Sequence, residues 1–248
     1  MTSPGYGTFG NLGHDYQKAR QEFPSGVFEV FAQKLAKTPP ETRALDLGCG
    51  TGIATRQLAE REYRVIGTDI DADMIQIARE QGGSTEYRVA QTSELPFVDA
   101  QFDAATAFSA FHWFSDSASV LQIRRVLKSS GIFMVVNKND VAGFKVGYRS
   151  ILAPFVEGTM PNAKKDYSPE TTLADAGFID IEKHVFSVDE AYSLDEALAY
   201  LRSVSLWNLV PESRKQDAAN AIKNYCESEA TEGVLRRSLE VIAIVGRN

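Results

Sequence analysis

Short apolar runs alternate with amphipathic stretches through the first half of the chain. The runs predict strands at Arg43–Leu47, Arg64–Thr68, Tyr87–Val89, Ala104–Phe108 and Ile132–Val136. Between them, helical spacing of apolar residues predicts helices at Ile53–Glu60, Asp73–Gln81 and Ser117–Leu127, the last of them ended by Gly131. Because strands that alternate with helices form right-handed βαβ units, the pattern predicts an α/β fold with a parallel sheet covered on both faces.

The two ends of the chain are richer in predicted helix. One helix is predicted over Tyr16–Lys37, before Pro39-Pro40. Later helices are predicted at Gly143–Phe155, Ser168–Gly177, Ser193–Leu201 and Glu212–Glu227, and strands at Ile181–Val188 and Leu239–Val245. Since no polar linker divides the chain, we expect a single domain over residues 1–248, with a sheet core over 14–137 and a helical cap over 189–235.

Composition narrows the class of protein. The 248 residues are 44% hydrophobic, enough for a large core without a disulfide or metal staple. A formal net charge of -7 argues against nucleic acid as a partner. The two cysteines, Cys49 and Cys226, indicate a reducing compartment, and no apolar run is long enough to span a membrane. We expect a cytoplasmic protein without a metal, and the sequence does not indicate its oligomeric state.

A glycine-rich loop, Gly48-Cys49-Gly50-Thr51-Gly52, lies between the first predicted strand of the sheet and the helix that follows it. Glycines let the backbone approach a ligand closely, and a helix N-terminus offers free N–H groups. In an open parallel sheet, ligands bind beyond the carboxyl ends of the strands. The loop therefore predicts a ligand site.

Two acids next to this loop bear on the kind of ligand. Asp46 comes just before the loop, where a carboxylate would repel a pyrophosphate but attract an ammonium group. Ile53 stands where a dinucleotide-binding loop usually has its last glycine. Asp69 ends the second predicted strand and can accept both hydroxyls of a ribose, which either ligand class contains. These features favour a positively charged ligand without a phosphate.

With these residues in place, the chain resembles a known family, the class I S-adenosylmethionine-dependent methyltransferases. The resemblance is carried, over residues 14–137, by Ala44–Gly52, Val65–Asp69 with Asp73-Met74, Glu94–Phe97 and Phe102-Asp103. Ala110–Phe114, the Tyr16, Arg20 and Phe23-Pro24 segment, and Tyr200–Ser203 resemble a small-molecule subgroup, methyltransferase type 11, which includes trans-aconitate-type enzymes. The resemblance implies the Rossmann-like fold of that class, a seven-stranded, mostly parallel sheet whose last strand is antiparallel, with a helical cap.

The resemblance also implies the cofactor, S-adenosyl-L-methionine, and its contacts. Gly48, Cys49 and Gly50 would lie against the methionine part, with Asp46 near its ammonium group and Asp69 on the ribose hydroxyls. The remaining expected cofactor residues are Tyr16, Arg20, Ile70, Met74, Gln91, Thr92 and Phe108. Ile70 and Met74 would pack on the adenine. Gln91 stands where the family often has an aspartate, and its amide oxygen can still accept a hydrogen bond. Arg20 either pairs with the cofactor carboxylate or lies on a solvated helix face.

Two residues after the fourth predicted strand are candidates for handling the methyl acceptor. His112 is a candidate general base or a wall of the acceptor pocket, with simple aromatic packing as the alternative. Trp113 lines the same pocket or belongs to the core. The expected reaction is methyl transfer to an oxygen, nitrogen or carbon of a small molecule. The alternatives are a cofactor-binding protein without turnover and a nicotinamide-dependent oxidoreductase, against which the loop spacing and Asp46 count.

Overall fold

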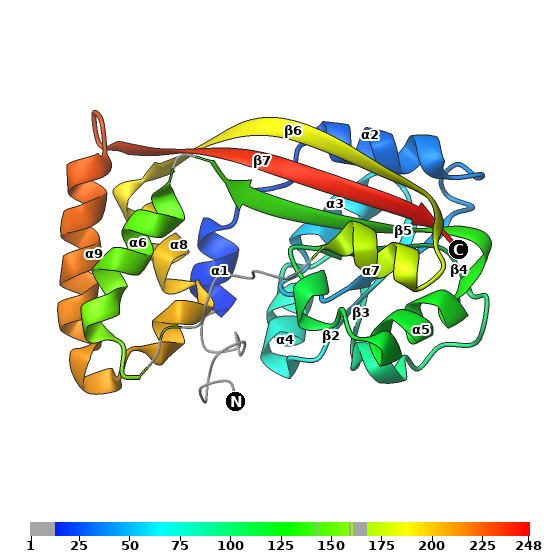
Figure 1. The fold of residues 1–248 in the computed structure, drawn as a ribbon, viewed down its shortest axis with the longest axis horizontal. Coiled ribbons are helices and arrows are strands. Elements are labelled where there is room, and N and C mark those ends of the chain that lie inside the picture. Colours follow the sequence, from blue (N-terminus) through cyan, green and yellow to red (C-terminus); the bar gives the residue numbers. More distant parts are fainter. Residues whose placement is uncertain (1–12, 142, 159, 161–167) are drawn as a thin grey trace. The chain divides into compact units, whose positions relative to one another are not determined.

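The computed structural model describes residues 13–141, 143–158, 160 and 168–248 (Figure 1). The chain forms two compact units, each assembled from several segments. The sheet unit comprises Glu22–Lys138, Asp166–Phe186 and Val241–Asn248. The helical unit comprises Met1–Gln21, Asn139–Lys165 and Ser187–Glu240. Within the described residues, no helix has both the length and the apolar character needed to cross a membrane.

Seven strands form one sheet in the order β3-β2-β1-β4-β5-β7-β6. Their bounds are Arg43–Leu47 (β1), Arg64–Asp69 (β2), Glu86–Val89 (β3), Phe102–Phe108 (β4), Leu127–Asp140 (β5), Ile179–Ser193 (β6) and Val234–Arg247 (β7). Strands β1 to β5 pair in parallel. Strand β7 runs antiparallel to β5, because Asn248 donates its backbone N–H to Gly131 while Val141 donates to Ser238. The mostly parallel sheet with an antiparallel last strand is confirmed.

Nine α-helices are described. The sheet unit holds α2 (Ser25–Lys34), α3 (Ile53–Glu60), α4 (Ala72–Glu80), α5 (Ser117–Val126) and α7 (Pro169–Asp175). The helical unit holds α1 (Gly13–Ala19), α6 (Phe144–Leu152), α8 (Leu194–Arg202) and α9 (Lys215–Glu229). Short 3-10 turns occur at Thr92–Glu94, Phe111–Trp113, Ala153–Phe155, Ser205–Leu209 and Glu212–Arg214.

The side-chain alternation of the central strands separates two layers of core. Leu45 and Leu47 of β1 pack with residues of β4 and β5 against α5 and α7, in one buried cluster. The intervening Asp46 points to the other face, where it meets Thr55 of α3 and Thr106 of β4. This alternation places one buried carboxylate under the glycine loop.

Local capping explains where several helices begin. Asp71 accepts hydrogen bonds from the first turn of α4, and Asp116 does the same for α5. Ser193 and Glu196 form the predicted capping box of α8, and Ser168 caps α7. These caps confirm the predicted starts of α7 and α8.

Several predicted boundaries were wrong. The single helix expected over Tyr16–Lys37 is two helices, α1 and α2, separated at Pro24, which occupies the N-cap position of α2. A proline is accommodated at a helix start but not in its interior. The helix α5 stops at Val126 and β5 begins at once, so that Gly131 lies inside a strand. Strands β5, β6 and β7 are also much longer than their apolar runs.

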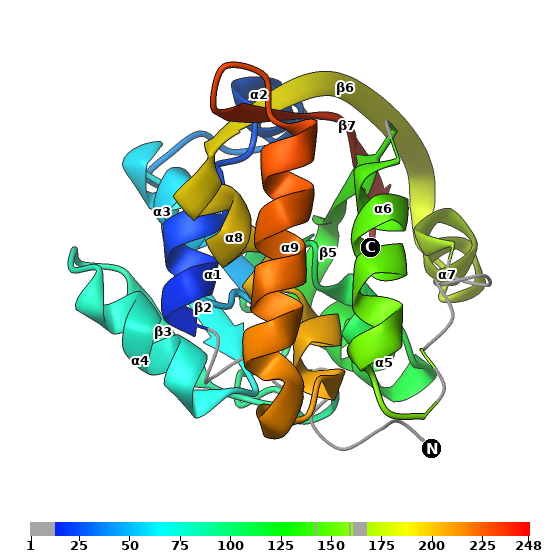
Figure 2. The same cartoon turned by 90° about the vertical axis from the view of Figure 1, so that its left-hand side faces the viewer.

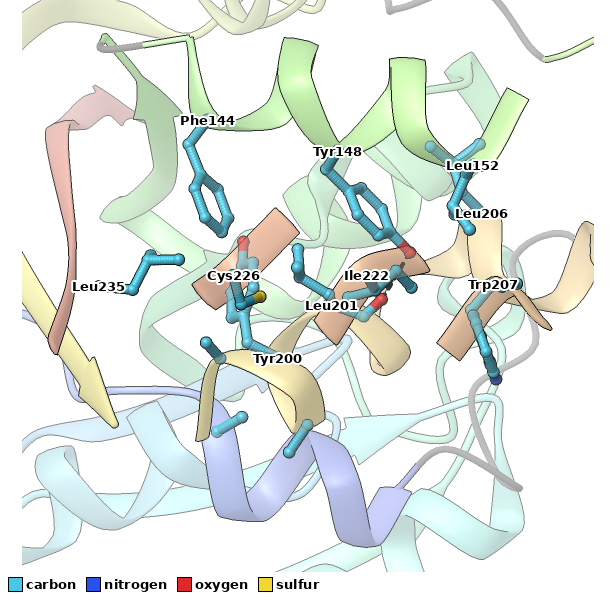
Figure 3. Close-up of a cluster of buried hydrophobic side chains, with 14 of the residues drawn as sticks. Phe144, Tyr148, Leu152, Tyr200, Leu201, Leu206, Trp207, Ile222, Cys226 and Leu235 are labelled. Atoms are coloured by element: carbon cyan, nitrogen blue, oxygen red, sulfur yellow. Dashed lines mark hydrogen bonds between the residues drawn. The ribbon is translucent and has the colours of Figure 1, made fainter. Parts of the chain in front are cut away.

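The helical unit, whose helices α1, α6, α8 and α9 are seen in Figure 2, has its own hydrophobic core (Figure 3). Helices α6, α8 and α9 contribute Tyr148, Leu201 and Ile222, among others, to this cluster. The Tyr148 hydroxyl donates a 2.6 Å hydrogen bond to the carbonyl of Leu201, which satisfies a buried polar group between α6 and α8. Trp207 lies at the edge of the same cluster (Figure 3).

Candidate functional site

The three glycines of the loop after β1 have different surroundings. Gly48, Gly50 and Gly52 all have positive φ, at 62°, 55° and 80°. A Cβ on Gly48 would lie 2.6 Å from the Cβ of Ala110, and one on Gly52 would lie 2.5 Å from the hydroxyl of Tyr87. Protein side chains therefore fill the space beside these two glycines.

The space beside Gly50 is open. Among the residues that the structure describes, a Cβ there would approach the terminal methyl group of Met74 alone, at 3.8 Å. Met74 itself is buried on α4. No protein packing thus requires a glycine at position 50, apart from its backbone angle. Gly50 itself is buried, and the open space beside it is where a ligand could contact the loop backbone.

Asp69 joins the glycine loop to the end of β2. Its Oδ2 accepts a 2.8 Å hydrogen bond from the backbone N–H of Gly50, and its Oδ1 accepts one of 2.9 Å from Asp71. Burial raises the pKa of the Asp69 carboxyl above its ordinary value, and the N–H groups of Asp71 and Gly50 oppose that rise. Each carboxylate oxygen has a second lone pair, so Asp69 can also accept hydroxyls of a ligand.

Asp46 is more deeply buried than Asp69, since the residue is only 1% exposed. Its Oδ2 accepts a 2.6 Å hydrogen bond from the Thr55 hydroxyl, and its Oδ1 accepts one of 2.9 Å from Thr106. Burial raises the pKa of Asp46 to about 6, although these two hydroxyls limit the rise. The Asp46 carboxylate under the loop is thus negatively charged at neutral pH and becomes protonated in mild acid.

Sequence reasoning missed both hydroxyls. Thr106 is a fully buried polar residue of β4, a strand whose other polar residue is Asp103, and it stands directly opposite Asp46 in the parallel register. Thr55 lies two residues into α3, on the helix face that meets the sheet. The signal in the sequence that could have revealed Thr106 is a polar residue at a strand position expected to be buried.

The remaining predicted contacts of the loop lie on the neighbouring strand ends. Ile70 follows Asp69 and is 68% exposed, so it can cover an apolar group. Ala90 donates its N–H to the carbonyl of Asp69, which brings the loop after β3 beside it. In that loop Gln91 is exposed and donates to Ser93, which leaves its amide oxygen for a ligand, while Thr92 is buried.

The Cys49 thiol lies inside the loop. The backbone N–H of Cys49 donates to Thr68, and its Sγ would be 3.0 Å from a Cβ on Gly67. Burial, with the nearby carboxylates of Asp69 and Asp46, raises the pKa of this thiol well above its usual value. A neutral thiol is a poor nucleophile, so Cys49 is a packing residue of the loop.

The segment after β4 begins beside the glycine loop, since Ala110 contacts Gly48. His112 and Trp113 follow on a 3-10 turn, with ring centroids 4.7 Å apart. His112 is half-buried and Trp113 is 43% exposed. Phe108 is buried instead, 4.7 Å from the ring of Phe23, so its predicted cofactor contact competes with core packing.

Tyr16 and Arg20 belong to the helical unit, whereas the other predicted site residues belong to the sheet unit. The Arg20 guanidinium lies over the rings of Tyr16 and Tyr200. Arg20 therefore has partners within its own unit, and the cofactor contacts expected for both residues stay predictions. Among the described residues, no group of three or more metal-ligating side chains could hold a metal ion.

The strand ends thus offer a particular set of chemical groups. An open position at Gly50 adjoins a hydroxyl-accepting carboxylate at Asp69, with the buried anion of Asp46 below the loop. Such a set fits a nucleoside that carries positive charge, as S-adenosylmethionine does, because the buried carboxylate of Asp46 would attract that charge and repel a phosphate.

Comparisons with known proteins agree with this assignment. A family described as "Methyltransferase domain" matches residues 45–135. A malonyl-[acyl-carrier protein] O-methyltransferase of Geobacter sulfurreducens is 31% identical over 71% of this chain and 69% of its own length. A probable S-adenosylmethionine-dependent methyltransferase of Mycobacterium tuberculosis is 30% identical over 62% of this chain and 54% of its own length. The solved structure of a putative type II methyltransferase from Anaeromyxobacter dehalogenans has a TM-score of 0.69 at 22% identity, over 92% of this chain and 97% of that one.

Proposed function

Because the chain belongs to the class I S-adenosylmethionine-dependent methyltransferases, we propose that it methylates a small-molecule acceptor. The observation that carries the proposal is the pairing of the open Gly50 position with the Asp69 carboxylate at adjoining strand ends. The glycine loop, Asp69 and Ile70 would hold the cofactor, with Asp46 opposite its positive charge. When bound, S-adenosylmethionine supplies a methyl group already activated by a sulfonium.

The contribution of the protein to the reaction is then positioning and exclusion of water. The hydrogen bond between Gly50 and Asp69 fixes the loop backbone relative to the carboxylate. A ligand that contacts one of them is therefore also positioned relative to the other. His112 and Trp113, which follow Ala110, are the residues we assign to the acceptor. His112 would either take a proton from the acceptor or line its pocket.

A small-molecule acceptor is supported by relatives rather than by a bound ligand. The relative from Geobacter sulfurreducens acts, by its name, on a malonyl group carried by a protein. A small acyl group is thus within the chemistry of related chains. The nicotinamide-dependent alternative has no support, since the family and these relatives are methyltransferases.

The test is formation of S-adenosylhomocysteine by the purified protein. Panels of small carboxylic acids, amines and phenols are compared with an acyl carrier protein and with RNA, and a Gly50→Val variant is the blank. Acceptor-dependent product with a small molecule supports the proposal. Methylation of RNA or protein alone would contradict it. Tight cofactor binding without turnover on any panel would favour the binding-protein alternative.

A further inference from the structure

The side chain of Arg125, on α5, binds the segment that follows the 3-10 turn after β3. Its Nη2 donates a 2.9 Å hydrogen bond to the carbonyl of Leu95, and its Nη1 donates one of 2.7 Å to the carbonyl of Phe97. The same Nη1 donates a 2.8 Å hydrogen bond to the Asp99 carboxylate. Gln122 accepts from Nε and Nη2, so that each N–H of the guanidinium has an acceptor. The segment is thereby fixed to α5.

The residues between Ala90 and Leu95 are held at both ends. At the start, the backbone N–H of Ala90 donates a 2.9 Å hydrogen bond to the carbonyl of Asp69. At the end, Leu95 is buried and its carbonyl is an acceptor of Arg125. Between them, the carbonyl of Gln91 accepts the hydrogen bond that closes the 3-10 turn. The place of Gln91 beside the end of β2 therefore depends on Arg125.

The amide of Gln91 also has a set direction. Its Nε2 donates a 2.7 Å hydrogen bond to the hydroxyl of Ser93. Because this bond engages the nitrogen side of the amide, the oxygen is the group offered to a ligand, and an amide oxygen can only accept. Gln91 is exposed, so a ligand can reach it. A 6-amino group on a purine would donate to this oxygen, whereas a 6-oxo group would face it with a second acceptor.

We propose that Arg125 and Ser93 are positioning residues that set Gln91 to accept the 6-amino group of the cofactor, which rests on the proposed function for the place of the adenine. Arg125 fixes where the turn lies, and Ser93 fixes which side of the amide faces the base. Lysine cannot replace Arg125, because one ammonium group does not span the acceptors that a planar guanidinium joins. Both residues act through Gln91, so their loss should lower selectivity for the base.

The experiment measures base selectivity by calorimetry, without turnover. It compares S-adenosylhomocysteine with S-inosylhomocysteine, in which a 6-oxo group replaces the 6-amino group. The wild type should bind the adenine compound about fivefold or more tightly, which is the factor that one net hydrogen bond contributes. Arg125→Lys and Ser93→Ala should each reduce this preference to less than about twofold. Thermal unfolding without ligand measures the stability of each variant separately.

Arg124→Lys is the matched control for Arg125→Lys. Arg124 is the preceding residue of α5, and its guanidinium binds other parts of the chain, with Nε donating a 2.8 Å hydrogen bond to Asn248 and Nη1 donating to the carbonyl of Ala176. The control should lose stability but keep the wild-type preference for adenine. An equal loss of preference in both arginine variants would make that loss an effect of stability and would overturn the role of Arg125.

A rescue variant tests the role of Ser93. In the Ser93→Ala background, Gln91→Glu replaces the amide by a carboxylate, whose two oxygens both accept and need no partner to orient them. The double variant should recover the wild-type preference. Failure of this rescue, or equal binding of the two compounds by the wild type, would overturn the inference and leave the proposed function standing. Binding of neither compound would contradict the proposed function as well.

Discussion

The backbone N–H of Gly50 donates a 2.8 Å hydrogen bond to Oδ2 of Asp69, and this bond ties the loop after β1 to the end of β2. The two residues are 19 positions apart in the chain. The bond makes the position of the carboxylate depend on the conformation of the loop. Changes at either residue should therefore act on the same binding event, though by different physical routes.

Replacing Asp69 by alanine should weaken S-adenosylmethionine binding by about 30- to 800-fold, since a carboxylate that accepts two hydroxyls contributes about 2–4 kcal/mol. Calorimetry on the folded variant measures the change. Asp73→Ala, an exposed acid in the first turn of α4, is the matched control. Binding by Asp69→Ala within about threefold of wild type would contradict the assignment.

Replacing Gly50 by valine should abolish cofactor binding while the protein still folds. The side chain would enter the open space beside the loop, and the positive φ adds strain of roughly 1–2 kcal/mol. Gly82→Val separates the two effects, because Gly82 also has a positive φ and no neighbour within 4 Å. Both variants should lose similar stability in urea unfolding. Normal cofactor affinity in Gly50→Val would mean that the loop is only a turn.

Replacing Asp46 by asparagine should stabilise the cofactor-free protein at pH 8 and weaken the binding of the cofactor. The folded state raises the pKa of Asp46 from 3.8 to about 6, so the folded chain holds this proton through a range where the unfolded chain has lost it. The stability contributed by Asp46 therefore falls as the pH rises from about 4 to 6, by up to about 3 kcal/mol. The gain in Asp46→Asn should be full above pH 6 and vanish near pH 4.

Urea unfolding of both proteins between pH 4 and 8 measures this difference, with Asp73→Asn as the control. Wild-type affinity for S-adenosylmethionine should also be about tenfold lower at pH 5 than at pH 8, because the protonated Asp46 no longer opposes a positive charge. A variant that is less stable than wild type at pH 8, with unchanged cofactor affinity, would remove Asp46 from the site.

Replacing His112 by alanine distinguishes its two assigned roles. If His112 is a general base, kcat should fall by about 100-fold or more. If it lines the pocket, the acceptor KM should rise with kcat nearly unchanged. A large loss of cofactor affinity with otherwise normal acceptor kinetics would exclude both roles.

The strands in the first half of the chain could be predicted because the apolar run that indicates each strand is a local feature of the sequence. The helix Ile53–Glu60 and the strand Arg43–Leu47 have the bounds that their periodicity indicates. The break at Pro24 was missed, although a proline inside a helical pattern is a direct warning. There, the Gln57 side chain bonds both the N–H and the carbonyl of Phe23, which replaces the hydrogen bonds that a continuous helix would have made.

The long strands and the roles of the glycines could not be predicted, because both depend on distant residues. The outer part of β6 is largely exposed and is ordered by pairing rather than by an apolar run. The loop sequence does not reveal that Ala110 and Tyr87 pack against Gly48 and Gly52. Only three-dimensional neighbours single out Gly50 as the open position.

The neutral thiol of Cys49 makes the glycine loop observable by chemistry. The chain has two cysteines, and Cys226 is fully buried in the helical unit. A maleimide should react with the folded protein only when one of these sites opens, and a thiol with a raised pKa reacts slowly even then. The labelling rate at Cys49, measured by peptide mass spectrometry, thus reports how often the loop opens. Bound cofactor should lower the labelling rate at Cys49 and leave the labelling rate at Cys226 unchanged.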